Sequence, residues 1–181
     1  MRCFIAVPCA KEVRDALASL QTPLNGYGGM KMVEQENIHL TLKFLGEVED
    51  AKAEAIAGEL EFLRREHAFE VKVKGLGAFP NASHAKVIWA GVEDGKRLFE
   101  LHERVDGKLE ALGFQREDRF HPHYTIARVK HISDKDGLHG FLAGENGTVF
   151  GSYTVNSIKL MSSRLTGKGP LYSTVAGYRL I

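Results

Sequence analysis

The distribution of apolar residues along the chain predicts an alternation of strands and helices. In residues 38–45 every even-numbered position is apolar, which is typical of a strand with one buried face. Apolar residues at helical spacing indicate helices in residues 11–20, 50–63 and 98–112, and a looser one in 134–143. Further strands are expected at 2–7, 69–74, 85–92, 122–130, 148–155, 157–162 and 171–180, with loops at the glycine-containing residues 26–29 and 75–81. The pattern predicts an α+β or α/β fold.

Length and composition are those of an ordinary globular chain. The 181 residues are enough for one domain, or for one compact body of two lobes, with a buried core. An apolar fraction of 44% with 26% charged residues excludes long disorder. Since 24 Lys and Arg are balanced by 23 Asp and Glu, there is no overall basic surface, and any contact with RNA or DNA has to be local.

Nothing in the sequence indicates membrane insertion or secretion. No stretch approaches the 18 or so uncharged apolar residues of a membrane span, and the apolar run near the start is too short for a signal peptide. Cys3 and Cys9 are too few for a disulfide framework, and we expect them to be buried thiols. These features predict a cytoplasmic protein without membrane association.

Two similar motifs, each with a histidine and a threonine two positions apart, lie in the two halves of the chain. They are His39-Leu40-Thr41 and His123-Tyr124-Thr125. Each follows a predicted helix and a polar stretch, and each leads into a predicted strand. This internal similarity suggests a duplication that produces two lobes about a pseudo-two-fold axis.

The two motifs suit chemistry on a phosphodiester. Side chains two positions apart on a strand share a face, so each histidine projects beside its threonine. Two imidazoles can divide general-acid and general-base work near neutral pH, and two hydroxyls can donate hydrogen bonds to non-bridging phosphate oxygens. Facing each other, the four side chains would bracket one phosphodiester without a metal.

The same residues also have plainer explanations. Threonine is common in strands, so a single motif of this kind carries no information. His121 and His123 have a spacing found in metal sites, but no spacing in the chain supplies a third ligand, and we expect no metal. We expect the remaining histidines to be surface or structural residues: His67, His84, His102, His131 and His139.

Two longer segments contain the motifs, Ile38–Val48 (IHLTLKFLGEV) and Pro122–Arg128 (PHYTIAR). They resemble the paired signatures of the 2H phosphoesterase superfamily, most closely its RNA 2',3'-cyclic phosphodiesterase branch, also called 2'-5' RNA ligase. Four shorter segments agree with this resemblance and stand in the expected order: Arg2–Val7, Gly77–Pro80, Ser163–Leu165 and Gly169–Tyr172.

The resemblance implies a fold and a reaction. The fold is α+β and bilobal, one domain over residues 1–181, with two facing antiparallel sheets, helices outside and a central cleft. The reaction is hydrolysis of an RNA 2',3'-cyclic phosphate end to a 2'-phosphomonoester, without metal or cofactor. His39 would donate a proton to the leaving 3'-oxygen, His123 would accept a proton from water, and Thr41 and Thr125 would hold the phosphoryl oxygens. Because the site is nearly symmetric, the two histidine roles could be exchanged.

The resemblance also implies partners. The substrates would be RNA ends with a 2',3'-cyclic phosphate, tRNA fragments among them, and we expect the protein to act as a monomer. Joining such an end to a 5'-hydroxyl through a 2'-5' bond is a further capability of the family.

Two cations are candidates for binding the substrate. The family pattern indicates that Arg128 contacts phosphate, but its odd separation from His123 places it on the opposite face of an ideal strand. A bulge or the end of the strand would therefore have to precede Arg128 if it is to reach the substrate. The same parity places Lys43 on the His39 face, as a second candidate.

Two other function classes remain open on the sequence alone. One is a 2H enzyme that acts on a small cyclic nucleotide or an ADP-ribose cyclic phosphate, and the other is a non-catalytic RNA-binding module on the same fold. An enzyme that binds only an RNA end needs to neutralise few phosphates, which agrees with the net charge of +1. We then expect positive charge to gather in one cleft around the two histidines.

Overall fold

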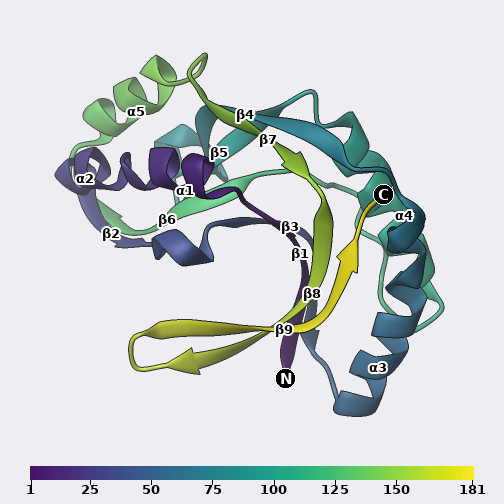
Figure 1. Ribbon diagram of the computed structural model, residues 1–181. Helices are drawn as coiled ribbons and strands as arrows, with labels where there is room; N and C mark the ends of the chain where they lie inside the picture. The colour runs from purple at the N-terminus through teal and green to yellow at the C-terminus, as the bar shows by residue number, and fades with distance from the viewer.

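The computed structural model describes all residues, 1–181. Nine strands form one antiparallel, curled sheet (Figure 1), in the order β7-β4-β5-β6-β3-β1-β8-β9, and β2 also pairs with β6. The strands are β1 (Arg2–Pro8), β2 (Gly28–Met32), β3 (His39–Glu47), β4 (Phe69–Phe79), β5 (Val87–Glu93), β6 (Tyr124–Ile132), β7 (Val149–Val155), β8 (Ser157–Thr166) and β9 (Gly169–Arg179).

The two halves of this sheet meet at a single residue pair. Leu40 of β3 is bridged to Tyr124 of β6, and no other pair joins these two strands. One half contains β7, β4, β5, β6 and β2, and the other contains β3, β1, β8 and β9. The architecture is the predicted α+β one, and the two sheets that we expected are the halves of one sheet, joined at this bridge.

The helices lie outside the curled sheet. They are α1 (Lys11–Ala18), α2 (Gln21–Leu24), α3 (Asp50–Glu59), α4 (Lys96–Glu110) and α5 (Lys135–Gly144), with 3-10 turns η1 (Asn25–Tyr27), η2 (Gln35–Asn37), η3 (Leu60–Arg65) and η4 (Ala82–His84). α1 and α5 pack against β7 and β4, whereas α4 packs against β3 and α3 against β9 (Figure 1). α4 buries Leu98, Leu101, Val105 and Leu109, the apolar stripe that predicts it. No helix of the chain has the length and apolar character needed to cross a membrane.

Two segments differ from the predicted elements. The predicted loop at residues 26–29 is partly strand β2, which runs so close to β6 that a Cβ on Gly28 would lie 2.2 Å from the carbonyl oxygen of His131. Glycine therefore permits this pairing. β4 continues through the predicted turn to Phe79, because Gly75 takes a positive φ of 77° within an irregularity of the β4–β5 register.

Candidate active site

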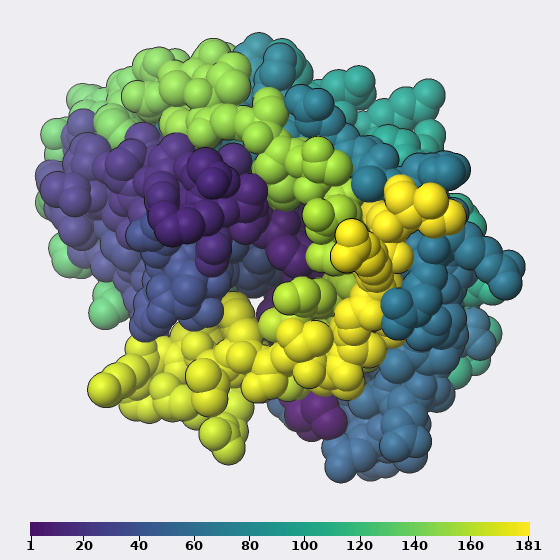
Figure 2. All heavy atoms as spheres, viewed as in Figure 1, coloured from purple at the N-terminus to yellow at the C-terminus, as the bar shows by residue number.

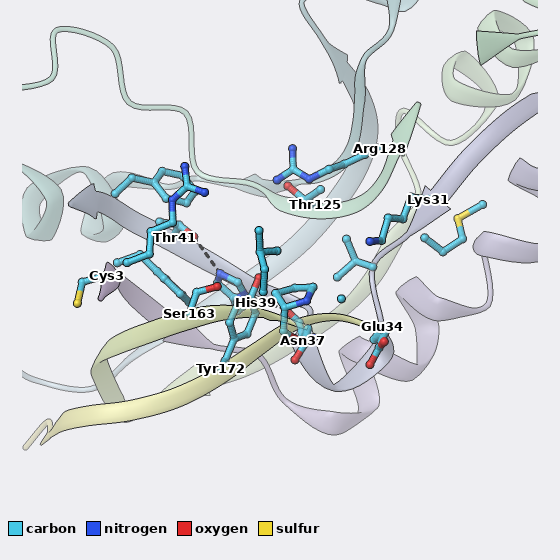
Figure 3. A pocket seen from close by; sticks show the side chains of 18 of the residues that line it. Cys3, Lys31, Glu34, Asn37, His39, Thr41, Thr125, Arg128, Ser163 and Tyr172 are labelled. Atoms are coloured by element: carbon cyan, nitrogen blue, oxygen red, sulfur yellow. Dashed lines mark hydrogen bonds between the residues drawn. The ribbon is translucent and has the colours of Figure 1, made fainter. Parts of the chain in front are cut away.

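The bridge between β3 and β6 brings the two histidine–threonine motifs together. In an antiparallel pair, the residue before a bridged position on one strand faces the residue after it on the other. His39 therefore falls opposite Thr125. Thr41 likewise falls opposite His123. All four side chains line one cavity of about 650 Å³, in which Figure 3 labels His39, Thr41 and Thr125.

The cavity opens beside the β8–β9 hairpin. In the space-filling view the surface is hollowed between this hairpin, in yellow, and the purple and blue N-terminal part of the chain (Figure 2). Lining residues come from both sides of the hollow, Lys31 to Glu34 from one and Lys168 to Pro170 from the other. The side-chain amide of Asn37 donates a long hydrogen bond, 3.5 Å, to the carbonyl of Pro170 and so connects η2 to the hairpin.

The imidazole of His39 is held in a fixed orientation. Its Nδ1 lies 2.6 Å from the carbonyl oxygen of Asn37, and its Nε2 lies 3.0 Å from Oγ1 of Thr41 (Figure 3). A carbonyl can only accept, so Nδ1 carries a hydrogen and Nε2 of the neutral ring accepts from the threonine hydroxyl. Phe4 stacks on the ring with centroids 5.0 Å apart, and Tyr172 meets it edge-on at 5.5 Å.

His123 is held in a matching way from the other half. Its Nδ1 donates to the carbonyl oxygen of His121 over 2.7 Å, which leaves Nε2 available for chemistry. Phe79 meets the ring edge-on at 4.9 Å, and Trp89 lies at 6.3 Å. His121 itself packs against Trp89 at 4.7 Å, and its ring lies 6.3 Å from that of His123. No group of three or more His, Cys, Asp or Glu side chains that could hold a metal ion lies here or elsewhere in the structure.

Both imidazoles favour the neutral form. Burial lowers the pKa of His39, because removal from water disfavours the charged ring; the hydrogen bond to Asn37 opposes this shift and the nearby His123 adds to it. Burial also lowers the pKa of His123; the His121 carbonyl opposes the shift, while the His121 ring and Arg128 add to it. An anion bound between the two rings would favour the protonated form of either one.

Arg128 reaches the cavity because β6 contains a bulge. In the β5–β6 ladder Ala127 pairs with Ile88 and Thr125 pairs with Trp89, so Ile126 is an extra residue on β6. Ile126 and Ala127 are both fully buried, and alternation resumes with Arg128 on the cavity face. Arg128 therefore reaches the cavity face through a bulge in its strand, which is one of the two routes that we expected.

A similar bulge in β3 makes the prediction wrong that Lys43 lies on the His39 face and binds the substrate. In the β1–β3 ladder Leu42 is the extra residue, so Lys43 turns away from His39 and is only 3% exposed. Its ammonium donates to a carboxylate oxygen of Asp106, on α4 behind the sheet. Phe44 takes the cavity-facing position that strand parity assigns to Lys43. Phe44 follows His39 by five positions, just as Arg128 follows His123 by five, so the two residues occupy equivalent places in the two halves.

The lining of the cavity is positively charged. Arg2, Lys31, Arg128 and Lys168 line it, against one acidic residue, Glu34. The expectation that positive charge gathers around the histidines is therefore confirmed. A cavity of this charge attracts anions and raises their local concentration.

Comparison with known proteins now identifies the family. The model of the family described as LigT-like phosphoesterases matches the chain in two stretches, residues 7–89 and 91–172. The chain belongs to the LigT-like phosphoesterase family. Each stretch contains one histidine–threonine motif, as expected of a duplicated unit. The resemblance to the 2H phosphoesterases is confirmed.

Relatives of this LigT-like phosphoesterase match it over nearly the full length. The RNA 2',3'-cyclic phosphodiesterase of Methanocaldococcus jannaschii is 36% identical, with 97% of this chain and 98% of the relative covered. The one of Aeropyrum pernix is 38% identical, with 91% and 90% covered. TT0787 of Thermus thermophilus has a similar crystal structure, with a TM-score of 0.81, 30% identity and 99% and 97% covered.

Sequence analysis identified the histidines, the threonines and Arg128 but missed the aromatic frame. The rings that hold the imidazoles come from four different strands, which only the folded sheet brings together. Three of them lie in the short segments that carry the family resemblance, and this is the signal that could have found them. The four rings are Phe4, Phe79, Trp89 and Tyr172.

Proposed function

We propose that this LigT-like phosphoesterase hydrolyses the 2',3'-cyclic phosphate end of RNA to a 2'-phosphomonoester. The observation that carries the proposal is the pair of histidine–threonine motifs, joined by one antiparallel bridge on the wall of one cationic cavity. Relatives named RNA 2',3'-cyclic phosphodiesterase support this substrate class. So do the structures of Escherichia coli LigT, which has the same fold at 24% and 23% identity, in complexes with 3'-AMP and with phosphate.

In the proposed reaction the two histidines act on opposite sides of the phosphorus atom. His123 accepts a proton from water at Nε2 while the water oxygen attacks phosphorus, in line with the 3'-oxygen. As the bond between phosphorus and the 3'-oxygen breaks, the 3'-oxygen takes the proton carried by Nε2 of His39. The products are a 2'-phosphate and a 3'-hydroxyl, and exchange of one proton with solvent returns each histidine to its starting form.

The remaining cavity groups stabilise the charge that develops on the phosphoryl oxygens. The hydroxyls of Thr41 and Thr125 donate to the two non-bridging oxygens, which requires the Thr41 hydroxyl to turn away from His39. Arg128 contributes a positive charge and planar hydrogen-bond donors on the Thr125 side. These side chains supply both proton transfers and the balancing charge, so the proposed mechanism needs no metal or cofactor.

Product analysis with an RNA oligonucleotide that ends in a 2',3'-cyclic phosphate tests the proposal. We expect hydrolysis in the presence of a chelator, with the phosphate left on the 2'-oxygen. His39→Ala and His123→Ala should each abolish turnover, while His67→Ala, which removes an exposed histidine outside the cavity, should leave it unchanged. A 3'-phosphate product would reverse the assignment of the leaving group, and full activity of either alanine variant would contradict the acid–base roles.

We also propose that the protein works as a monomer in the cytoplasm on ends such as those of tRNA fragments. Cys3 and Cys9 are free thiols, which is typical of a reducing compartment. The bridged motifs come from one chain, so a second copy is not needed to complete the cavity. Light scattering of the active enzyme tests the monomer, and comparison of cleaved tRNA with other cyclic-phosphate RNAs tests the substrate.

A further inference from the structure

One end of the cavity lies away from the two histidines and is lined by Arg2 and Phe44. In the β1–β3 ladder, Pro8 pairs with His39, whereas Phe44 pairs with Phe4, near the start of β1. Arg2 is two residues from that pair, which is about 7 Å along a strand. Both side chains line the cavity, so they lie within reach of one bound group.

Arg2 has no charged partner in the structure. Some surface cations elsewhere are paired with neighbouring carboxylates, as Lys72 and Lys74 are with Glu93. The guanidinium of Arg2 forms neither an ion pair nor a hydrogen bond, although it is exposed at the cavity wall. The cyclic phosphate carries a single negative charge and is already served by Arg128. Arg2 is therefore available for a second phosphate.

Phe44 is an aromatic ring left open to the cavity. It is 66% exposed, which is unusual for phenylalanine, and the β3 bulge turns it outward at the position where the other half carries Arg128. Its nearest ring is Phe4, with centroids 6.4 Å apart. An exposed aromatic ring beside an unpaired cation is the combination with which proteins bind single-stranded nucleic acid, the base stacking on the ring and the phosphate pairing with the cation.

The opposite end of the cavity is less suited to this task. Lys31 and Lys168 line it, but so does Glu34, whose carboxylate repels phosphate. No ring as exposed as Phe44 lines that end. The Arg2 end is therefore the better site for a nucleotide.

We propose that Arg2 and Phe44 form a subsite for the nucleotide that precedes the cyclic-phosphate end. Its base stacks on Phe44, and the phosphate that links it to the last nucleotide pairs with Arg2. The inference rests on the proposed function and extends it, because it makes the enzyme prefer the end of an RNA strand over a cyclic mononucleotide.

Three substrates separate the contributions of base and phosphate. They are adenosine 2',3'-cyclic phosphate, the dinucleotide ApA with a 2',3'-cyclic phosphate end, and the same dinucleotide lacking the first base. We expect Phe44→Ala to lower kcat/KM for the complete dinucleotide roughly 5- to 100-fold, as for loss of one base–aromatic stack, and to affect the other two substrates much less. Arg2→Met should lower kcat/KM for both dinucleotides and reduce the slope of log(kcat/KM) against log[salt] by about 0.7.

Two matched variants serve as controls. Phe99→Ala removes a ring that is 45% exposed on α4, outside the cavity, and Lys96→Ala removes an exposed cation that also has no ion pair. Both should leave the preference for the dinucleotide unchanged.

Equal losses on the mononucleotide and the dinucleotide in Phe44→Ala would overturn the proposal, because Phe44 would then act through Phe4 and His39. The absence of any preference for the dinucleotide in the parent enzyme would overturn it too. If the parent hydrolyses none of the three substrates, the proposed function itself fails, and the subsite with it.

Discussion

Lys43 and Asp106 form an ion pair directly behind the strand that carries the first histidine–threonine motif, with side chains only 3% and 1% exposed. Lys43 also donates to the carbonyl oxygen of Gln115 at 2.9 Å, and Asp106 accepts from the backbone N–H of Glu117 at 2.7 Å. Burial raises the pKa of Asp106, but the Lys43 ammonium and the Glu117 N–H outweigh it, so that the pKa is lowered overall. The pair anchors the bulge of β3 to α4.

Removing one partner should be much worse than removing both. Asp106→Ala leaves the buried Lys43 ammonium with only the partly exposed carboxylate of Glu117, 3.6 Å away, as a counter-charge, and should lower the free energy of unfolding by up to about 3–5 kcal/mol. The double variant Lys43→Met/Asp106→Leu should recover most of this loss, because no unpaired charge remains. Urea unfolding of the three proteins measures the effect. A single variant as stable as the parent would show that the pair does not anchor the strand.

The rate should have an acidic optimum. The reaction needs one histidine protonated and the other neutral, and the structure lowers the pKa of both His39 and His123 from the ordinary value near 6.5. At high pH the proton donor is lost, and at low pH the base is protonated. We therefore expect a bell-shaped profile of kcat/KM, which reports the free enzyme, with its maximum below about pH 6.5. Rates at constant ionic strength measure it, and an optimum on the alkaline side of neutrality would contradict the assignment.

Loss of the Arg128 side chain should lower kcat/KM, whereas loss of the Lys130 side chain, two positions further along β6, should not. Arg128→Met should lower kcat/KM by about 10- to 100-fold, the cost of losing charge-assisted hydrogen bonds to the phosphoryl group. Arg128→Lys should retain part of the activity, because it keeps the charge but not the planar donors. Lys130→Met removes an exposed cation that does not line the cavity and serves as the control. Similar losses in both methionine variants would indicate a general effect of charge instead of a contact.

The two threonines should act through their hydroxyls. Thr41→Val and Thr125→Val keep the shape of the side chain but remove the donor, and each should lower kcat at least about tenfold. Thr41→Ser and Thr125→Ser should keep most of the activity. Steady-state kinetics on a cyclic-phosphate oligonucleotide decide between the two pairs of variants. If the valine enzymes were as active as the serine enzymes, the threonines would contribute packing alone.

Strand parity predicted the histidine–threonine faces correctly but failed beyond the threonine of each strand, for Lys43 in β3 and for Arg128 in β6. The reason is the extra residue that each strand carries, Leu42 in β3 and Ile126 in β6. In β6 the successive apolar residues Ile126 and Ala127 are a visible sign of a bulge. In β3 the corresponding position holds Lys43, whose burial depends on a carboxylate more than 60 positions away. No local pattern can reveal such a partner.

The aromatic rings around the histidines could not be predicted from local sequence patterns either. Phe4 and Tyr172 surround one imidazole although they lie near opposite ends of the chain. Their contact depends on β1 pairing with β8, and on β8 pairing with β9. The sequence predicts that these strands exist, but not which of them become neighbours.

The lone bridge between Leu40 and Tyr124 has a consequence for how the two imidazoles are spaced. Each histidine lies one residue from the bridged pair, on opposite strands, so one backbone contact and the packing of one continuous hydrophobic core across both halves set the distance between the two rings. A substitution in that core, well away from the cavity, can therefore alter the distance between the acid and the base without touching either residue.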